Sequence, residues 1–138
     1  GVAMDTSTIT VVLFSERGVF VITAEAARFV AGMGDVLLSV FVPDATAGLA
    51  IIETGAGSDA DFMDLLDGLM PRDEGRYRHQ HGSPGHGADH VMPGVVAPSA
   101  VVTVVAGEMT LGTWQSIVLV DPNADNPQRT VRFSFIKG

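Results

Sequence analysis

The chain has 138 residues, of which 46% are hydrophobic, and it contains no cysteine. A chain of this length can bury a core without disulfides or a structural metal, so we expect one domain over residues 1–138. The lack of cysteine excludes disulfides and thiolate chemistry and favours a cytoplasmic location. Sixteen acidic residues against eight basic ones give a net charge of −8, which repels phosphate backbones and disfavours nucleic acid as a partner.

The apolar content predicts an additional buried surface rather than a membrane segment. The longest apolar runs, such as residues 101–106, are far too short to cross a bilayer. The chain also does not open with the basic and long apolar segments of a signal peptide. We therefore expect no membrane partner. A hydrophobic content this high in a small chain favours burial between subunits.

Strands dominate the predicted first half of the chain. Alternation of apolar residues with threonine predicts strands at 6–15 and 19–22. Thr23 can cap a helix with one broad apolar face, which a pair of glycines ends. The continuous apolar run 36–42 is typical of a strand covered on both faces. We expect residues 47–53 to form a further strand that pairs with it across the short intervening turn.

The second half begins with a helix and ends with strands. A capping signal at Ser58 starts a helix with apolar residues at helical spacing, and Pro71 ends it. Residues 71–89 are rich in glycine and proline and predict a long loop, which in a compact domain is usually either functional or disordered. Short helical turns are expected at 90–97. Three strands follow at 99–106, 114–121 and 129–136. About seven strands and two helices, with strands dominant, predict an α+β domain.

The glycine-rich segment carries all four histidines of the chain, His79, His81, His86 and His90. Neutral imidazole is the commonest metal ligand. Four histidines within twelve residues favour a binding site over side chains that are merely solvated. We expect His79 and His90 to come close enough to share one metal ion or one anion, because the loop can fold back on itself. His86 and His90 have the spacing of a helical ligand pair, but the flanking glycines make a helix doubtful. His79 and His81 would point to opposite faces of a strand.

Other polar residues are candidates for the same site. Asp44 lies at a strand end, where side chains reach clefts, although an Asx turn explains it equally well. Glu53 closes an apolar strand, either as a half-buried acid or as the solvated end of that strand. Gln115 is a candidate polar contact beside the single tryptophan, a residue type that more often lies in a core. Arg78 or Arg129 could bind a small phosphorylated ligand.

Several short motifs follow one another in a fixed order from about residue 8 to the C-terminus. They are Phe41-Val42-Pro43, Thr46-Ala47-Gly48-Leu49 with Glu53, Leu69-Met70-Pro71, Tyr77-Arg78-His79, Ala88-Asp89-His90, Pro98-Ser99 and Leu111-Gly112-Thr113-Trp114-Gln115. In this order and spacing they resemble the secondary thiamine-phosphate synthase family, small trimeric proteins long catalogued as uncharacterised. The resemblance implies two packed, mainly antiparallel sheets with two flanking helices, and a homotrimer with sites near subunit boundaries. It also implies a weak transferase activity that joins a pyrimidine pyrophosphate to a thiazole phosphate.

The chain departs from the family pattern near the expected site. Asp44-Ala45-Thr46-Ala47 stands where the family has His-Thr-Ser/Thr-Ala, Ile52 stands in place of Asn, and Ser116 in place of Gly. A carboxylate can replace imidazole as a ligand for zinc or for a harder cation. The expected metal site is therefore His79, His90 and Asp44, with zinc or magnesium as the divalent metal.

The leading hypothesis is a homotrimer with marginal thiamine-phosphate synthase-type chemistry. In it the metal neutralises the pyrophosphate leaving group, Arg78 assists, Gln115 orients the substrate, and Glu53 completes the catalytic set. One alternative is a non-catalytic module that holds a metal or a small phosphorylated metabolite. Another is a structural trimer whose site has decayed, so the sequence leaves open whether the protein is an enzyme.

Overall fold

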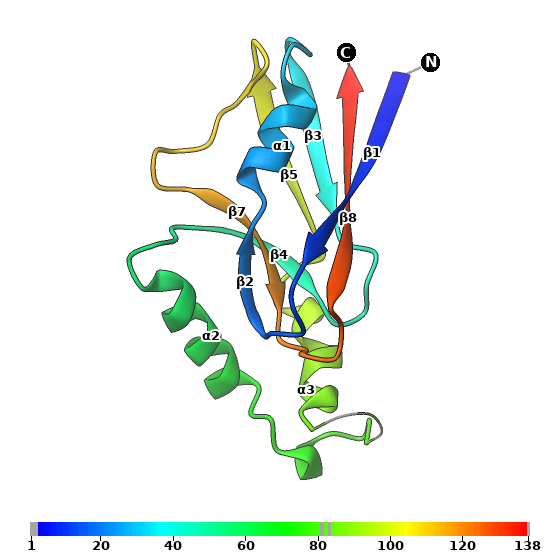
Figure 1. Ribbon diagram of the computed structural model, residues 1–138, viewed down its shortest axis with the longest axis vertical. Helices are drawn as coiled ribbons and strands as arrows, with labels where there is room; N and C mark the ends of the chain where they lie inside the picture. Colours follow the sequence, from blue (N-terminus) through cyan, green and yellow to red (C-terminus); the bar gives the residue numbers. More distant parts are fainter. Residues whose placement is uncertain (1–2, 81, 83, 138) are drawn as a thin grey trace.

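The computed structural model describes residues 3–80, 82 and 84–137, which form an α+β fold of two antiparallel sheets and three α-helices (Figure 1). The strands are β1 (Ala3–Val12), β2 (Gly18–Val21), β3 (Val36–Phe41), β4 (Gly48–Ile52), β5 (Ser99–Val105), β6 (Glu108–Met109), β7 (Ser116–Asp121) and β8 (Gln128–Lys137). The helices are α1 (Thr23–Val30), α2 (Ser58–Leu69) and α3 (His86–Val91), with 3₁₀ turns η1 (Glu74–Arg76) and η2 (Met92–Gly94). The predicted fold class is confirmed.

The larger sheet has the strand order β1-β8-β3-β5-β6, and the smaller sheet has the order β2-β7-β4. All strand pairings among the described residues are antiparallel, and β1 pairs with β8 along ten residues. In β3 only alternate residues are buried, so one face of the larger sheet points inward and the other outward. The inward face packs against the smaller sheet and α1.

One core joins the two sheets. Leu38 and Phe133 from the larger sheet pack with Leu119 from the smaller sheet and with Val30 from α1. A second cluster lies on the other face of the smaller sheet, where Leu66 of α2 and Met92 of η2 cover it. The smaller sheet is therefore covered on both faces, and residues 117–120 of β7 are fully buried.

Two expectations about the strands were wrong. The strand covered on both faces is β7, not β3, because outward side chains of β3 such as Leu37 stay exposed. The segment 48–52 does not pair with β3 either; it pairs with β7 in the smaller sheet. Two apolar runs joined by a short connection are compatible both with a hairpin and with a second strand that joins another sheet. The local sequence therefore could not distinguish these two arrangements.

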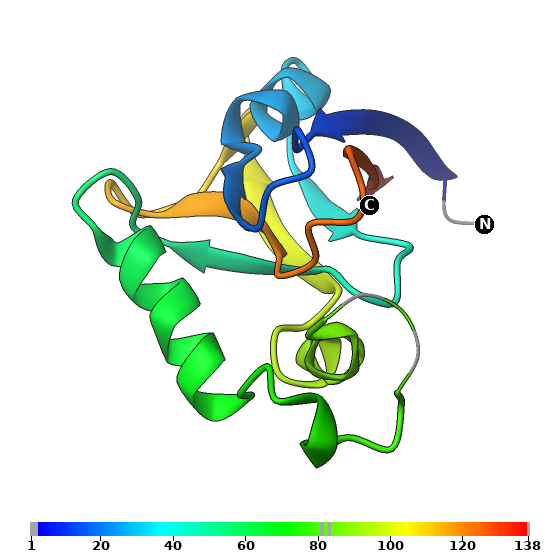
Figure 2. The ribbon, with the colours of Figure 1, turned by 60° about the horizontal axis from the view of Figure 1, so that its bottom comes forward.

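The element count also differs from the expected seven strands and two helices. The two-residue strand β6 pairs with β5, and the expected strand 114–121 begins only at Ser116. Within the expected loop 71–89 lie η1 and the start of α3. Figure 2 shows α3 nearly end-on, near the turn between β7 and β8. None of the described helices is long and apolar enough to cross a membrane.

Candidate metal centre

Three histidines converge at one end of the molecule. One possible ligand atom from each of His79, His86 and His90 lies within 4.8 Å of the other two. The His79 ring lies 4.3 Å from the His90 ring and 5.0 Å from the His86 ring, measured between centroids. His86 and His90 lie one turn apart on α3, and their Nε2 atoms are 2.8 Å apart. The structure thus brings His79 and His90 together as expected, and it adds His86.

Two glycines allow α3 to form and to approach His79. Gly85 precedes the helix with φ of +86°, a left-handed conformation that glycine adopts without strain. Gly87 lies against the segment before the helix, since a Cβ there would come within 2.6 Å of Tyr77 Cβ and 2.9 Å of the His79 carbonyl oxygen. The glycines that made a helix doubtful from sequence are therefore what permits this helix in this place.

A buried ion pair fixes α3 between its two histidines. Asp89 is fully buried and accepts hydrogen bonds from the Arg72 guanidinium at 2.5 Å and 3.2 Å. Burial raises the pKa of Asp89 above its ordinary value despite the opposing effect of Arg72. Glu74 accepts a hydrogen bond from the Gly85 backbone N–H at 2.5 Å, at the start of the helix. Residues between α2 and α3 thus hold the helix that carries two of the histidines.

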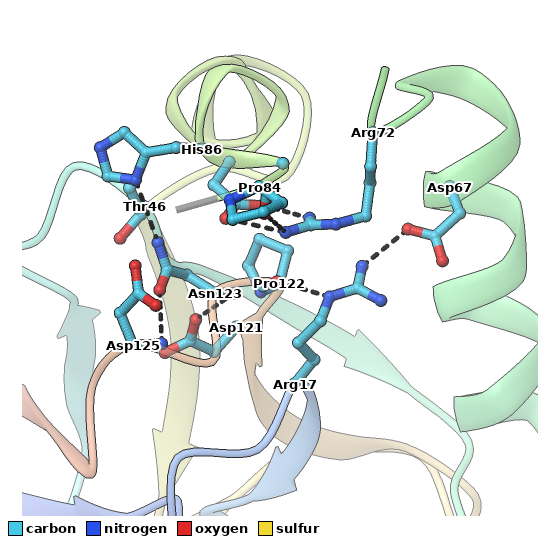
Figure 3. Close-up of polar contacts among 12 residues, drawn as sticks. Arg17, Thr46, Asp67, Arg72, Pro84, His86, Asp121, Pro122, Asn123 and Asp125 are labelled. Atoms are coloured by element: carbon cyan, nitrogen blue, oxygen red, sulfur yellow. Dashed lines mark hydrogen bonds and ion pairs between the residues drawn. The ribbon is translucent and has the colours of Figure 1, made fainter. Parts of the chain in front are cut away.

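The turn after β7 contacts the cluster from below (Figure 3). The Asn123 side-chain Nδ2 lies 3.5 Å from Nδ1 of His86. The Asn123 backbone N–H donates to Asp121, whose carboxylate also accepts from Arg129 at 2.5 Å. Asp121 is fully buried and Arg129 is 4% exposed. A chain of polar contacts therefore runs from His86 into the core.

Asp44 belongs to this buried charge network. Its carboxylate forms an ion pair with Arg129 and accepts hydrogen bonds from the backbone N–H and hydroxyl of Thr46 at 3.0 Å and 3.1 Å. Burial raises the pKa of Asp44, but the Thr46 amide and the Arg129 charge outweigh it and hold the pKa below its ordinary value. Burial lowers the pKa of Arg129, whereas Asp121 and Asp44 raise it to a larger extent.

The network has consequences for two sequence expectations. Asp44 does not belong to the three-residue group whose ligand atoms converge in the described part of the chain. It forms instead the Asx-type contact, with Thr46, that was the alternative interpretation. Arg129 was a candidate for a phosphorylated ligand, but its guanidinium binds two carboxylates and a threonine hydroxyl inside the protein.

The other candidates lie apart from the three histidines or outside the residues that the structure describes. Glu53 and Gln115 flank the paired residues Ile52 and Ser116. At about 3.3 Å per residue, β7 separates them from the Asp121 end by roughly 17 Å. Arg78 precedes His79 and is exposed. His81 lies outside the described residues.

The segment before β7 is an ordered turn on the surface. Gln115 is exposed, and its Oε1 accepts a hydrogen bond from the Gly112 backbone N–H at 2.7 Å. Trp114 is 75% exposed, in contrast to the core position that is usual for this residue type. Gln115 thus contacts the backbone of its own turn.

Sequence reasoning missed some of the residues around the centre. The four-residue spacing of His86 and His90 was the available signal for the helical pair, and it was outweighed by the neighbouring glycines. Asn123 was visible only as part of a polar turn after a strand. No local pattern links that turn to a histidine 37 positions earlier.

A family profile described as UPF0047 protein YjbQ-like matches residues 7–138. The chain belongs to the YjbQ-like UPF0047 family. A UPF0047 protein of Mycobacterium bovis is 58% identical over 124 residues, which cover 90% of this chain and 95% of that protein. A UPF0047 protein of Archaeoglobus fulgidus is 30% identical over 97 residues, which cover 70% of this chain and 75% of the other. These matches establish the family. The names of the matched proteins state no thiamine-phosphate synthase activity.

Solved structures with the YjbQ-like fold agree with the architecture. A YbjQ-like protein of unknown function from Sulfolobus solfataricus superposes with a TM-score of 0.90 over all of both chains, at 18% identity. A hypothetical protein from Aeropyrum pernix has a TM-score of 0.85 and 27% identity, covering 97% of this chain and 99% of the other. The fold of this YjbQ-like chain is thus supported by two solved structures with different degrees of sequence identity.

Proposed function

We propose that this YjbQ-like protein binds a divalent transition metal through His79, His86 and His90. The observation that carries the proposal is the convergence of three imidazole ligand atoms within 4.8 Å. Three imidazoles in one chain are the protein donor set of a common type of zinc site, which leaves a position for a further ligand. The fixed position of α3, held by Arg72 and Asp89, supports a site prepared before a metal arrives.

The chemistry of the donors selects among the metals expected from the sequence. Imidazole nitrogen suits zinc and other transition metals, whereas magnesium prefers oxygen ligands and keeps several waters. With Asp44 paired to Arg129, the proposed donor set is nitrogen only. The proposal is therefore zinc rather than magnesium, and it uses His86 where the sequence suggested Asp44.

Neutral imidazoles would leave a bound dication its full charge, in a protein whose net charge is −8. A bound metal would supply Lewis acidity toward an anionic oxygen such as that of a phosphate or pyrophosphate. Arg78, next to His79 in the chain and exposed, could donate hydrogen bonds to the same anion. This chemistry is compatible with the weak thiamine-phosphate synthase-type transfer implied by the sequence resemblance, or with a non-catalytic site for a small phosphorylated metabolite.

A site that also uses Glu53 and Gln115 would need a second subunit. These residues lie at the far end of β7 from Asn123, which contacts the histidine cluster. Side chains separated by the length of a rigid strand cannot reach one small substrate within one chain. In the proposed homotrimer, Glu53 and Gln115 of one copy would complete the site of the next.

The outward face of the larger sheet supports the proposed self-association. Leu37, Val101 and Ile136 point outward and are exposed, and with Ser39 and Ser134 they line a hollow of about 270 Å³. Contiguous exposed apolar surface of this kind commonly marks a contact between subunits. We propose this face as the trimer contact and, in line with the lack of cysteine, the cytoplasm as the location.

Metal analysis of the purified protein tests the proposal. A chelator first removes any bound metal from the protein, which is then titrated with zinc or magnesium. Elemental mass spectrometry measures the amount of metal bound per chain. We expect one zinc per chain and little magnesium. Turnover of the pyrimidine and thiazole substrates by the zinc-loaded protein then separates an enzyme from a binding module. A protein that retains no zinc at micromolar concentration would refute the metal function.

A further inference from the structure

Arg72 joins the end of α2 to the helix that carries two of the histidines. It follows shortly after α2 ends at Leu69, and its guanidinium binds both carboxylate oxygens of Asp89, at 2.5 Å and 3.2 Å. The same guanidinium donates to the carbonyl oxygen of Pro84 at 3.2 Å (Figure 3). One side chain therefore fixes the chain at two points, one before α3 and one within it.

The residue before α3 leaves room for this guanidinium. Gly85 immediately precedes the helix, and a Cβ at this position would lie 2.1 Å from Nη2 and 2.4 Å from Nε of Arg72. The guanidinium thus packs directly on the glycine, in space that any other side chain would fill. The start of α3 and the side chain of Arg72 are fitted to each other.

The helix needs such a support, because it is short. α3 spans the six residues His86–Val91, and a helix of that length is not stable by itself in water. Met92, which follows it, is 1% exposed and packs in the second apolar cluster. The helix itself buries only two small residues and Asp89. The contacts of Arg72 therefore matter most for the half of α3 that lies away from Met92.

The ion pair between Arg72 and Asp89 is suited to fix a position. The side chain of Asp89 is 1% exposed and that of Arg72 is 25% exposed. The cost of removing both charges from water largely offsets their attraction, so a pair of this kind adds little to global stability. A guanidinium that binds both oxygens of a carboxylate does impose a defined relative orientation. The pair therefore specifies where α3 lies more than how stable the fold is.

We infer that Arg72 is the positioning residue of the proposed metal centre: through Asp89 and Pro84 it sets where α3 presents its two histidines, and lysine cannot replace it. The inference rests on the proposed metal-binding function. Lysine keeps the charge, but its ammonium is a point charge without the planar fork that matches a carboxylate. With lysine, the two histidines of α3 lose their fixed position relative to His79, and the geometry at the metal changes.

Zinc affinity and a cobalt spectrum test the role of Arg72. Arg72→Lys should bind zinc about 10-fold more weakly than the wild type, as is typical when the support of metal ligands is lost. Cobalt in place of zinc reports its ligand geometry through its visible absorption, and we expect a shifted band in Arg72→Lys. A loss of global stability alone would leave the band of the loaded protein unchanged. Arg76→Lys, the same change at an exposed position in the same segment, is the control and should equal the wild type in both measurements.

A double-mutant cycle shows whether Arg72 acts through Asp89. Asp89→Asn should also weaken zinc binding about 10-fold. The double variant Arg72→Lys, Asp89→Asn should be no weaker than either single variant, because the same contact is lost once. A double variant weakened about 100-fold would mean that the two residues act independently, which overturns the inference. Zinc binding by Arg72→Lys equal to that of the wild type, or an unshifted cobalt band, would also overturn it.

Amide hydrogen exchange in α3 gives a readout that needs no metal. The Asp89 N–H donates to the Gly85 carbonyl at 3.1 Å, and the Met92 N–H donates to the carbonyl of Ala88. In Arg72→Lys we expect faster exchange at these two amides and unchanged exchange in the buried strand β7. Unchanged exchange in α3 contradicts the role of Arg72 even if zinc binds. A wild type that binds neither zinc nor cobalt, with faster exchange in the variant, instead refutes the metal function and with it the role of Arg72 at a metal.

Discussion

The Nε2 atoms of His86 and His90 lie 2.8 Å apart on successive turns of α3, and the ring of His79 lies against both. Residues four apart on a helix share one face, so the pair is aligned by the helix itself. The third ring comes from the segment before the helix, which Gly87 allows to approach closely. The three rings therefore form one unit, and the loss of any ring should affect the site as a whole.

His90→Ala should abolish stoichiometric zinc binding while the fold persists. His90 is half-buried in a short surface helix and does not belong to either apolar core cluster. Elemental analysis after zinc loading measures the binding, and circular dichroism monitors the fold. Val91→Ala, an exposed change on the same helix, is the control and should keep one zinc per chain. Full zinc retention by His90→Ala would show that the ligands are elsewhere.

Asp44→Asn should keep its zinc, because the Asp44 carboxylate binds Arg129 and Thr46. The same metal analysis tests this expectation. Loss of zinc from Asp44→Asn, with the fold intact, would instead support Asp44 as a ligand, as the sequence suggested.

Acidification should lower the free energy of unfolding, in part because Asp44 becomes protonated. Its pKa in the folded protein lies below the ordinary value of 3.8, so the carboxylate stabilises the fold above that pH. This contribution is lost as the pH falls through the lower pKa of the folded state. Urea unfolding from pH 7 to pH 2.5 should therefore show a stability difference between wild type and Asp44→Asn that shrinks below about pH 4. Asp64→Asn, at an exposed position, is the control. A constant difference across this range would contradict the linkage.

Gly87→Ala should destabilise the protein and weaken metal binding. Alanine improves helix propensity by about 1 kcal/mol, but its Cβ would lie 2.6 Å from Tyr77 Cβ, and overpacking costs about 1–3 kcal/mol. The clash therefore outweighs the propensity and pushes α3 away from His79. Gly68→Ala in α2, where no atom lies within 4 Å of the new Cβ, should instead stabilise by up to about 1 kcal/mol. Thermal melts and zinc titration compare the two, and equal effects would argue against the close approach.

Leu37→Asp should break the proposed trimer, whereas Leu65→Asp should not. The two leucines are similarly exposed, 49% and 56%, but Leu37 lies on the outward face of the larger sheet and Leu65 on α2. A carboxylate buried in an apolar contact without a partner costs several kcal/mol. Light scattering should give three chains for wild type and Leu65→Asp and one chain for Leu37→Asp. A wild type with the mass of one chain at micromolar concentration would refute the trimer.

The sequence determined the strand-dominated fold class because alternation and apolar runs act locally. It also indicated the histidine segment, since four imidazoles in twelve residues form a local pattern. The pairing of His79 with His90 could be anticipated because glycine-rich chain can reverse direction. The family motifs added the arrangement of two antiparallel sheets, which the solved relatives support.

Only the tertiary structure decided which residues meet. Strand β4 (48–52) pairs with β7 in the smaller sheet and not with β3, and this choice depends on packing between elements far apart in sequence. The pairing of Asp44 with Arg129 joins residues 85 positions apart, and the contact of Asn123 with His86 joins residues 37 apart. A single side chain carries no signal for such a partner, because the favourable energy of the contact exists only once the sheets and α3 have packed.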